Sequence, residues 1–321
     1  MKILILGAGA IGSVFGGFLA KSGHEVALLG RQAHMATINQ NGLKIEGIWG
    51  EHDITSHIKG YTLLSAIREG EGNAFDLILL TVKSYDTEAV IRDYLQYFLN
   101  NAPMVSLQNG LGNLEKIVEL LGSDRAIGGR VIFGAEIIES GRVKVTVYAD
   151  AVVVGGVSGG IDSRMVEKIA AIFSQSGIPS HATNEIEKYI WGKVLYNSAL
   201  NALGSILEVN YGELLNREET RKIIVYIIYE IFSVIEKSKT RLFWNTPDEY
   251  LKLLFDELIP ATYNHFPSML QDIRRKRMTE IESINGAVVK TGEDLGLFLP
   301  VNKVTLNLVK VKERIARSDA R

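Results

Sequence analysis

The stretch M-K-I-L-I-L-G-A-G-A-I-G, residues 1–12, decides the fold of the first half of this chain. Its apolar run at residues 2–6 is typical of a buried strand, and it leads directly into glycines at positions 7, 9 and 12. A helical pattern of apolar residues follows over residues 11–22. A strand, a G-x-G-x-x-G loop and a helix in this order predict the dinucleotide-binding turn of a Rossmann-like domain.

Each glycine of this loop has its own physical task. Gly7 permits a tight turn, Gly9 lets a pyrophosphate approach the backbone, and Gly12 lets the helix pack closely on the strand. The helix N-terminus adds amide donors and positive potential, which favour a bound phosphate. The predicted cofactor-binding residues of this loop are Gly7, Ala8, Gly9, Ala10, Ile11 and Gly12. The alternative is that these are ordinary turn glycines of an α/β fold.

The end of the second predicted strand favours NADP(H) over NAD(H). NAD enzymes usually carry an acid there, about 20 residues beyond the glycine loop, which holds the ribose hydroxyls. Here Gly30 and Arg31 occupy that place. A guanidinium can pair with a 2′-phosphate through two hydrogen bonds or stack on the adenine. The alternative is that Arg31 is a solvated loop residue.

The first half of the chain alternates short apolar runs with helical patterns. The strand-like runs lie at residues 2–6, 25–29, 77–82 and 104–107, and the helical patterns between them include residues 11–22 and 114–121. Runs that are apolar throughout indicate strands covered on both faces, so the alternation predicts a parallel sheet. Residues 143–147 and 151–155 are expected to add antiparallel strands.

From about Thr183 the pattern changes to long helical repeats and shows no further strand. The repeats cover residues 185–203, 218–237, 247–258 and 279–295. The sequence therefore predicts an α/β, Rossmann-like NADP-binding domain at residues 1–181 and an all-α substrate-binding and catalytic domain at residues 182–321. Pro179 interrupts the pattern near this boundary.

Composition excludes several classes of function. Lys and Arg number 35 against 37 Asp and Glu, a formal charge of -2, so no global attraction to nucleic acid or an anionic membrane is expected. The chain has no cysteine, which excludes disulfides and thiolate catalysis and agrees with a cytoplasmic location. The six histidines show no metal-ligand spacing, so no metal is predicted, and His34, His52 and His57 are assigned to loops.

The most apolar later run, residues 223–235, is not expected to cross a membrane. It contains Glu230 and is shorter than the roughly 20 residues that a span requires. The run is either part of the core or a homodimer interface.

Polar residues follow two of the predicted strands where each strand ends. Lys83 comes directly after the strand at 77–82, and Asn109 follows the strand at 104–107. In open α/β sheets, ligands bind at the carboxyl ends of the strands, so both side chains are candidates for contact with the cofactor or the substrate. The alternatives are a surface lysine and an Asn-Gly turn.

The helical half carries an unusual column in W-G-K-V-L-Y-N-S-A-L-N, residues 191–201. Lys193, Asn197 and Asn201 recur every fourth residue, which places them on one face of a helix. Hydride addition to a ketone builds negative charge on the carbonyl oxygen, and a lysine can donate the proton that neutralises it. The alternative is a core helix whose lysine reaches solvent and whose amides bond to backbone.

Together these motifs resemble the ketopantoate reductase (2-dehydropantoate 2-reductase) family nearly end to end. The motifs are G-A-G-A-I-G, T-V-K at Lys83, Q-N-G at Asn109, W-G-K-V-L-Y-N-S-A-L-N, S-M-L-Q-D at Ser268, and T-E-I-E-S-I-N-G. The resemblance implies NADPH-dependent reduction of a small anionic 2-keto acid, ketopantoate, to (R)-pantoate in pantothenate and coenzyme A biosynthesis.

The resemblance also implies roles for individual residues. Lys193 matches the catalytic general acid, and Asn109, Asn197, Asn201 and Ser268 match substrate-binding positions. The matching cofactor-binding positions outside the glycine loop are Arg31, Lys83, Asn109, Ala135 and Glu280.

One position departs from the family pattern, because Tyr211 stands where the family often has Asn and Asn210 lies one residue earlier. This keeps open a related reductase of another 2-keto acid. A non-catalytic NADP(H)-sensing protein is a further alternative, although a sensor has no need of the Lys193 proton donor.

The C-terminal motif requires a break in the helix, because Ser268 and Glu280 would lie about 18 Å apart on one continuous helix. Two capping boxes are predicted, Ser268 with Gln271 and Thr279 with Glu282, separated by an irregular stretch at residues 276–278.

Overall fold

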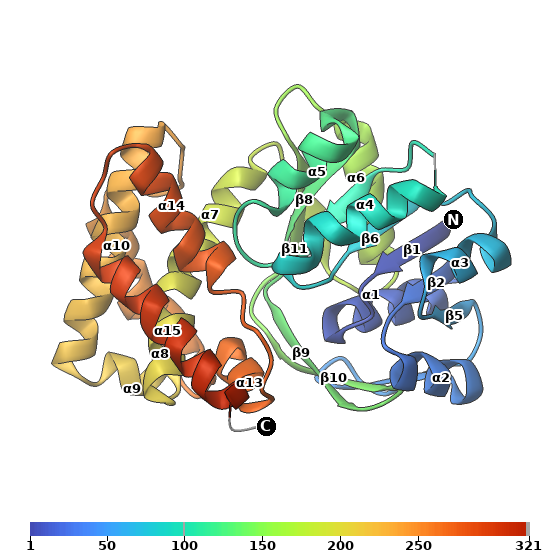
Figure 1. The fold of residues 1–321 in the computed structure, drawn as a ribbon, viewed down its shortest axis with the longest axis horizontal. Coiled ribbons are helices and arrows are strands. Elements are labelled where there is room, and N and C mark those ends of the chain that lie inside the picture. Colours follow the sequence, from blue (N-terminus) through green and yellow to red (C-terminus); the bar gives the residue numbers. More distant parts are fainter. Residues whose placement is uncertain (99, 319–321) are drawn as a thin grey trace. The chain divides into compact units, whose positions relative to one another are not determined.

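The computed structural model describes residues 1–98 and 100–318 (Figure 1). The chain divides into two compact units. The first unit holds Met1–Gln108 and Asn113–Ile186, and the second holds Asn109–Gly112 and the described chain from Glu187 onward. The four residues Asn109–Gly112 therefore belong with the helical second unit, although their neighbours on both sides belong to the first.

The first unit is built on an eight-stranded sheet. Its strands are β1 (Lys2–Leu6), β2 (Glu25–Leu29), β5 (Ile58–Tyr61), β6 (Leu77–Leu80), β7 (Met104–Ser106), β8 (Ala126–Arg130), β11 (Val152–Gly156) and β12 (Ser180–Ala182). Their order is β12-β11-β8-β7-β6-β1-β2-β5, and all neighbours pair in parallel except β8 and β11. The predicted parallel sheet and the antiparallel strand at residues 151–155 are confirmed.

A second sheet corrects one prediction. It contains β3 (Leu43–Gly47), β4 (His52–Ile54), β9 (Phe133–Glu139) and β10 (Arg142–Tyr148), in the order β4-β3-β10-β9. The strand expected at residues 143–147 is β10, which pairs antiparallel with β9 but parallel with β3. It therefore does not extend the main sheet. Strand pairing depends on distant partners, so the local pattern could not specify which sheet β10 joins.

The helices of the first unit cover both faces of the main sheet (Figure 1). They are α1 (Ala10–Lys21), α2 (Gln32–Asn41), α3 (Leu64–Glu71), α4 (Thr87–Tyr97), α5 (Asn113–Leu121) and α6 (Ser163–Gln175), with 3-10 turns η1 (Ser84–Asp86) and η2 (Ser123–Arg125). Helix α1 packs between the two sheets. A Cβ on Gly16 would lie 2.6 Å from Leu28 of the main sheet, and one on Gly17 would lie 2.6 Å from Ile45 of the smaller sheet. Two adjacent glycines thus allow this close packing.

The loop assignment of His34 is wrong, because His34 lies within α2 and only 6% of it is exposed. Its Nδ1 accepts a hydrogen bond from Gly141 N at 2.9 Å, and its Nε2 lies 3.0 Å from Ser13 Oγ. The ring is therefore neutral, with its proton on Nε2. Burial lowers the pKa of His34. His52 begins β4 rather than lying in a loop, and His57 directly precedes β5.

The second unit is helical, and no strand occurs in its described residues. Its helices are α7 (Ile186–Tyr196), α8 (Ala202–Leu207), α9 (Tyr211–Leu215), α10 (Glu218–Ser238), α11 (Pro247–Leu253), α12 (Ile259–Ala261), α13 (Ser268–Arg274), α14 (Ala287–Asp294) and α15 (Pro300–Ser318). Three π-helical turns interrupt them: η3 (Asn197–Asn201), η4 (Leu254–Leu258) and η5 (Glu282–Gly286). The predicted combination of an α/β half and an all-α half is confirmed.

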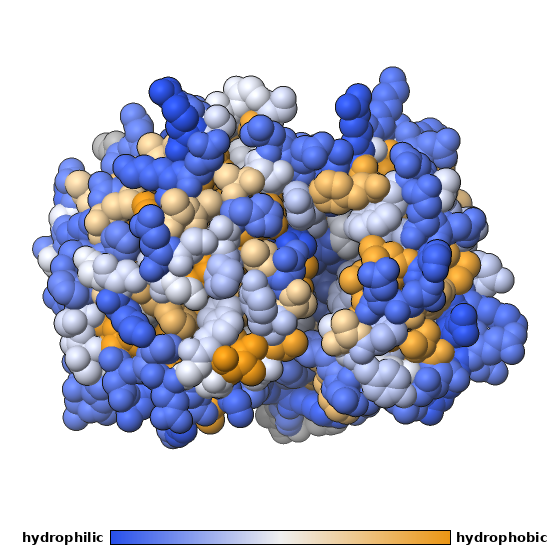
Figure 2. All heavy atoms as spheres, turned by 180° about the vertical axis from the view of Figure 1, so that it is seen from behind, coloured by the Kyte–Doolittle hydropathy of each residue, from blue (hydrophilic) through white to orange (hydrophobic). Residues whose placement is uncertain are grey.

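The apolar run at residues 223–235 forms the core of the second unit. Ile224, Ile227 and Ile231 of α10 are completely buried, whereas Tyr226 and Tyr229 on the other side of the helix are 58% and 46% exposed. No helix among the described residues is long and apolar enough to cross a membrane. On the face drawn in Figure 2, hydrophilic residues predominate and hydrophobic residues are scattered among them.

Candidate active site

The glycine loop connects β1 to α1 and makes a tight turn. Gly7 has φ +111°, and a Cβ there would lie 2.5 Å from Val82 N, so a larger residue would be both strained and obstructed. The N–H groups of Gly7 and Ala8 both donate to Leu29 O at the end of β2, at 3.2 and 2.7 Å. These bonds tie the loop to the neighbouring strand.

The other two glycines of the loop have opposite surroundings. A Cβ on Gly12 would collide with the carbonyl oxygen of Gly7, which is the close packing that the motif requires. A Cβ on Gly9 would meet no atom within 4 Å. Helix α1 begins at the next residue, Ala10, and has no acidic side chain in its first turn. Open space over Gly9 beside a helix N-terminus suits a bound phosphate.

Arg31 is exposed and is the N-cap residue of α2, directly after Gly30 at the end of β2. No acid occupies these two positions. Burial raises the pKa of Asp86, and the positive charge of the Arg31 guanidinium partly opposes that effect. The half-buried Lys83 precedes η1, and the half-buried Ala135 pairs with Val145 across β9 and β10.

A hydrogen-bond network that sequence analysis missed joins the ends of β6 and β7. Gln108 Nε2 donates to Val82 O at 2.8 Å and to Thr87 Oγ1 at 2.7 Å. Thr87 Oγ1 donates in turn to Asn113 Oδ1 at 2.9 Å, and Asn113 Nδ2 donates to Ser84 Oγ at 3.2 Å. This network holds the segment after Lys83. The only available sequence signal was a run of polar residues after two buried strands.

The tetrapeptide Asn109–Gly112 is bound to the helical unit. Asn109 Nδ2 donates to Glu280 Oε2 at 3.1 Å, and Leu111 N donates to Ser283 O at 2.8 Å. Gly110 has φ +87° and lies directly against Ser283, where a side chain would collide with its carbonyl. Two residues that the sequence placed at the site, Asn109 and Glu280, are therefore in direct contact.

The predicted column of Lys193, Asn197 and Asn201 does not lie on one regular helix. Lys193 is in the last turn of α7 and is partly exposed, whereas the π turn η3 runs from Asn197 to Asn201. Both asparagines are buried, at 7% and 4% exposure. π turns are rare and often occur at functional sites. The sequence could not reveal this π turn, because α7 before it and α8 after it show the same helical pattern of apolar residues.

Asn201 is hydrogen-bonded to the start of α13. Its Nδ2 donates to Ser268 Oγ at 3.2 Å, and its Oδ1 accepts from Met269 N at 3.1 Å. Ser268 itself is exposed and makes no capping bond, and Pro267 is the N-cap residue. The predicted capping box from Ser268 is therefore wrong: the buried Asn201 amide satisfies the helix N–H instead.

The predicted break after α13 is confirmed, but the second capping box is wrong. Helix α13 ends at Arg274, Lys276 adopts a left-handed φ of 56°, and regular turns resume with η5 at Glu282. Thr279 Oγ1 accepts from Ile281 N at 3.2 Å. Thr279 thus bonds to the residue two positions on, and not to Glu282 three positions on as the capping box requires.

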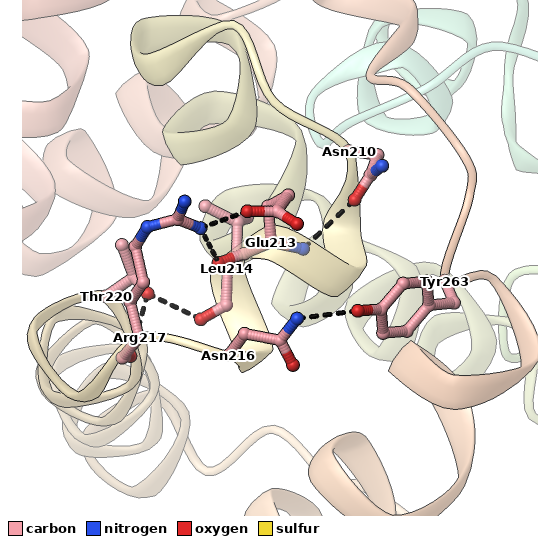
Figure 3. Close-up of polar contacts among 7 residues, drawn as sticks. All are labelled: Asn210, Glu213, Leu214, Asn216, Arg217, Thr220 and Tyr263. Carbon is pink, nitrogen blue, oxygen red and sulfur yellow. Dashed lines mark hydrogen bonds and ion pairs between the residues drawn. The ribbon is translucent and has the colours of Figure 1, made fainter.

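Asn210 and Tyr211 have structural positions. Asn210 is the N-cap of α9, and its Oδ1 accepts from Glu213 N at 3.0 Å (Figure 3). Tyr211 is only 2% exposed and packs edge-on against Tyr196, with ring centroids 5.6 Å apart, and against His265. Because the Asn210 side chain caps α9, it does not take the place of the asparagine that the family often has at position 211.

The predicted site residues form two groups, one in each unit. The first unit holds the glycine loop, Arg31, Lys83 and Ala135, and the second holds Asn109, Lys193, Asn197, Asn201, Ser268 and Glu280. In residues 1–98 and 100–318, no cluster of three or more His, Asp or Glu side chains is arranged to hold a metal ion.

Comparison with known proteins covers nearly the whole chain. The family described as "Ketopantoate reductase PanE/ApbA" matches residues 3–159, and "Ketopantoate reductase PanE/ApbA C terminal" matches residues 185–313. A 2-dehydropantoate 2-reductase of Aquifex aeolicus is 42% identical over 98% of this chain and 97% of that protein. One of Pyrococcus abyssi is 34% identical over 98% of this chain and 99% of that protein.

Solved structures with the same fold include two kinds of protein. A PanE/ApbA family ketopantoate reductase from Ralstonia eutropha JMP134 has a TM-score of 0.87 at 28% identity, covering 99% of this chain and 100% of that one. D-mandelate dehydrogenase, solved with NADH and anilino(oxo)acetate, has a TM-score of 0.86 at 29% identity, covering 98% and 99%.

Proposed function

Because this chain belongs to the ketopantoate reductase family, we propose that it reduces 2-dehydropantoate (ketopantoate) to (R)-pantoate with NADPH. The 42% identity to a 2-dehydropantoate 2-reductase over nearly the full length of both chains carries this proposal. The residues that sequence analysis singled out supply the chemistry described below.

The first unit suits NADP(H). Gly7 and Gly12 shape the loop, and open space over Gly9 beside the start of α1 would receive the pyrophosphate. Arg31 would pair with the 2′-phosphate, since no acid follows β2 to hold free ribose hydroxyls. Lys83 and Ala135 are proposed as further contacts with the cofactor. When bound, the nicotinamide supplies the hydride.

Lys193 is proposed as the general acid. As a hydride reaches the keto carbon, negative charge develops on its oxygen, and the ammonium donates a proton there. The partly exposed position of Lys193 at the end of α7 leaves its proton replaceable from solvent. A side chain of this kind contributes about 10²- to 10⁴-fold to such a reaction.

The remaining residues are proposed to orient the substrate. Asn197 and Asn201, at the two ends of η3, offer amide donors and acceptors without adding charge. Ser268, bonded to Asn201, offers a hydroxyl at the start of α13 for the carboxylate. Asn109 and Glu280, bonded to each other, would contact the nicotinamide ribose and the substrate hydroxyl.

A second candidate is a reductase of another 2-keto acid. Two observations favour it: the high structural similarity to D-mandelate dehydrogenase, and the buried Tyr211 at a position where the family often has Asn. A non-catalytic NADP(H)-binding protein is the third candidate, and the presence of Lys193 argues against it, because such a protein needs no proton donor. The domain limits at residues 181 and 182, the homodimer and the cytoplasmic location stay predictions.

The decisive experiment follows the oxidation of NADPH and NADH with ketopantoate and with a panel of 2-keto acids, phenylglyoxylate included. The proposal expects the highest kcat/KM for ketopantoate with NADPH. A higher value for an aromatic 2-keto acid would establish the second candidate. Cofactor binding without turnover of any keto acid would establish the third.

A further inference from the structure

We infer that Asn285 is a positioning residue for the substrate site, because it holds the π turn η3 that carries Asn197 and Asn201. This inference rests on the proposed function of those two asparagines. Asn285 lies in another π turn, η5, which packs against η3. It is completely buried and is not expected to touch the substrate.

The π turn removes a helical hydrogen bond from one buried carbonyl. In a regular α-helix, the N–H of Ala202 would donate to Ser198 O, four residues back. In η3 that N–H donates to Asn197 O, five residues back. Ser198 is 0% exposed, so water does not replace this donor at the surface of the unit. A buried carbonyl in this position requires another partner.

Asn285 provides that partner. Its Nδ2 donates to Ser198 O at 3.2 Å and to Asn302 Oδ1 at 3.1 Å, which uses both of its N–H bonds. Rotating the amide by half a turn would bring its oxygen against these two oxygens. The orientation of the side chain is therefore determined by its partners, even though Asn285 Oδ1 is buried without a hydrogen bond.

Asn302 connects this contact to the rest of the unit. Its Nδ2 donates to Glu230 Oε2 at 2.8 Å and to Ile227 O at 3.2 Å, both on α10. The Glu230 carboxylate also accepts from Val301 N and Asn302 N at the start of α15, at 2.8 and 2.9 Å. Since Asn302 must donate to Glu230, its oxygen faces Asn285. Helices α10 and α15 thus orient Asn285 toward η3.

The register of η3 determines where Asn201 points. Its side chain is bonded to both Ser268 and Met269 at the start of α13. If the π turn relaxed to an α-helix, the extra residue would shift one side of the helix by one position, a rotation of about 100°. Asn201 would then turn away from Ser268 and Met269, while the glycine loop of the first unit would be unaffected.

The test compares Asn285→Leu with wild type. Leucine has a similar volume, lacks the donor and leaves no room for water. We expect the KM for ketopantoate to rise about tenfold, because the misplaced site would lose about one hydrogen bond to the substrate. The Kd for NADPH should be unchanged. Hydrogen exchange of the segment at residues 196–206 should become faster. If the leucine variant does not fold, Asn285→Ala lacks the same donor and serves in its place.

The matched control is Thr220→Val. Thr220 Oγ1 is a buried hydroxyl on α10 of the same unit, and its hydrogen-bond partners are Leu214 O at 2.5 Å and Arg217 O at 2.9 Å, neither of which belongs to η3 (Figure 3). This variant should change neither the KM nor the exchange of residues 196–206. Unchanged KM and unchanged exchange in the Asn285 variant would overturn the inference. If wild type reduced no keto acid, the proposed function would fail, and the exchange measurement alone would decide whether Asn285 holds η3.

Discussion

Asn109 Nδ2 donates a hydrogen bond to Glu280 Oε2 across 3.1 Å, although 171 positions of sequence separate the two residues. The preceding residue, Gln108, is bonded to Val82 O and belongs to the other compact unit. The peptide bond between residues 108 and 109 is thus a point at which the chain passes from the α/β unit to the helical unit. The bond between Asn109 and Glu280 therefore fixes the first residue of the chain that belongs to the helical unit.

We therefore expect the effects of Asn109→Ala and Glu280→Ala on kcat/KM to be strongly non-additive. A shared hydrogen bond can be lost only once, so the double variant should fall short of the summed effects by about 0.5–3 kcal/mol. Kinetics of the four proteins of this cycle measure the coupling. Additive losses would mean that the two side chains act independently.

Lys193→Ala should lower kcat about 10²- to 10⁴-fold, because the proposed proton donor is lost. The Kd for NADPH should stay as in wild type. Lys188→Ala is the matched control, because Lys188 lies on the same helix, with its ammonium 5.3 Å from the ring centroid of Phe243. Its kcat should not change. Wild-type turnover in the Lys193 variant would remove this residue from the mechanism.

Arg31→Ala should weaken NADPH selectively. Hydrogen bonds to a charged group contribute about 1.5–3 kcal/mol, so the KM for NADPH is expected to rise roughly 10- to 100-fold while that for NADH changes little. Steady-state kinetics with both cofactors test this. The control is Arg68→Ala, an exposed arginine of α3. A parallel loss with NADH would show that Arg31 does not recognise the 2′-phosphate.

Asn210→Ala should destabilise the protein without altering its kinetics. The variant removes the acceptor that caps Glu213 N at the start of α9, which costs about 0.5–2 kcal/mol. Asn210→Asp keeps an acceptor and should retain most of the free energy of unfolding. Denaturant titration measures both variants. A raised KM for the keto acid in Asn210→Ala would instead place Asn210 in the substrate site.

His34 should make stability depend on pH below neutrality. Burial lowers the pKa of His34 in the folded state, so the unfolded chain takes up the proton first as the pH falls. The stability that neutral His34 contributes is complete above its unfolded pKa of about 6.5 and is lost as the pH drops through the lowered folded value. Urea titrations between pH 7.5 and 5 should show a shallower pH dependence for His34→Gln. Equal slopes would contradict the assignment.

Sequence analysis predicted the elements whose signals are local. The strand at residues 2–6, the glycine loop and α1 follow one another within about twenty residues, and their apolar periods and glycines are sufficient to identify them. The break between Ser268 and Glu280 was also predictable, because a single helix would have separated them too far. The precise caps there were not, since Asn201, 68 positions away, supplies the bond to Met269 N.

By itself, the sequence determined the fold class, the family and the set of polar residues proposed for the site, because these depend on residue type and on spacing along the chain. Only the tertiary structure decided that a π turn runs from Asn197 to Asn201, that Asn109 donates to Glu280, and that Asn285 donates to Ser198 O. These features are hydrogen bonds between groups that become neighbours after the helices have packed. Local periodicity carries no information about such partners, since a buried amide can be satisfied by any donor or acceptor that the fold brings within about 3 Å.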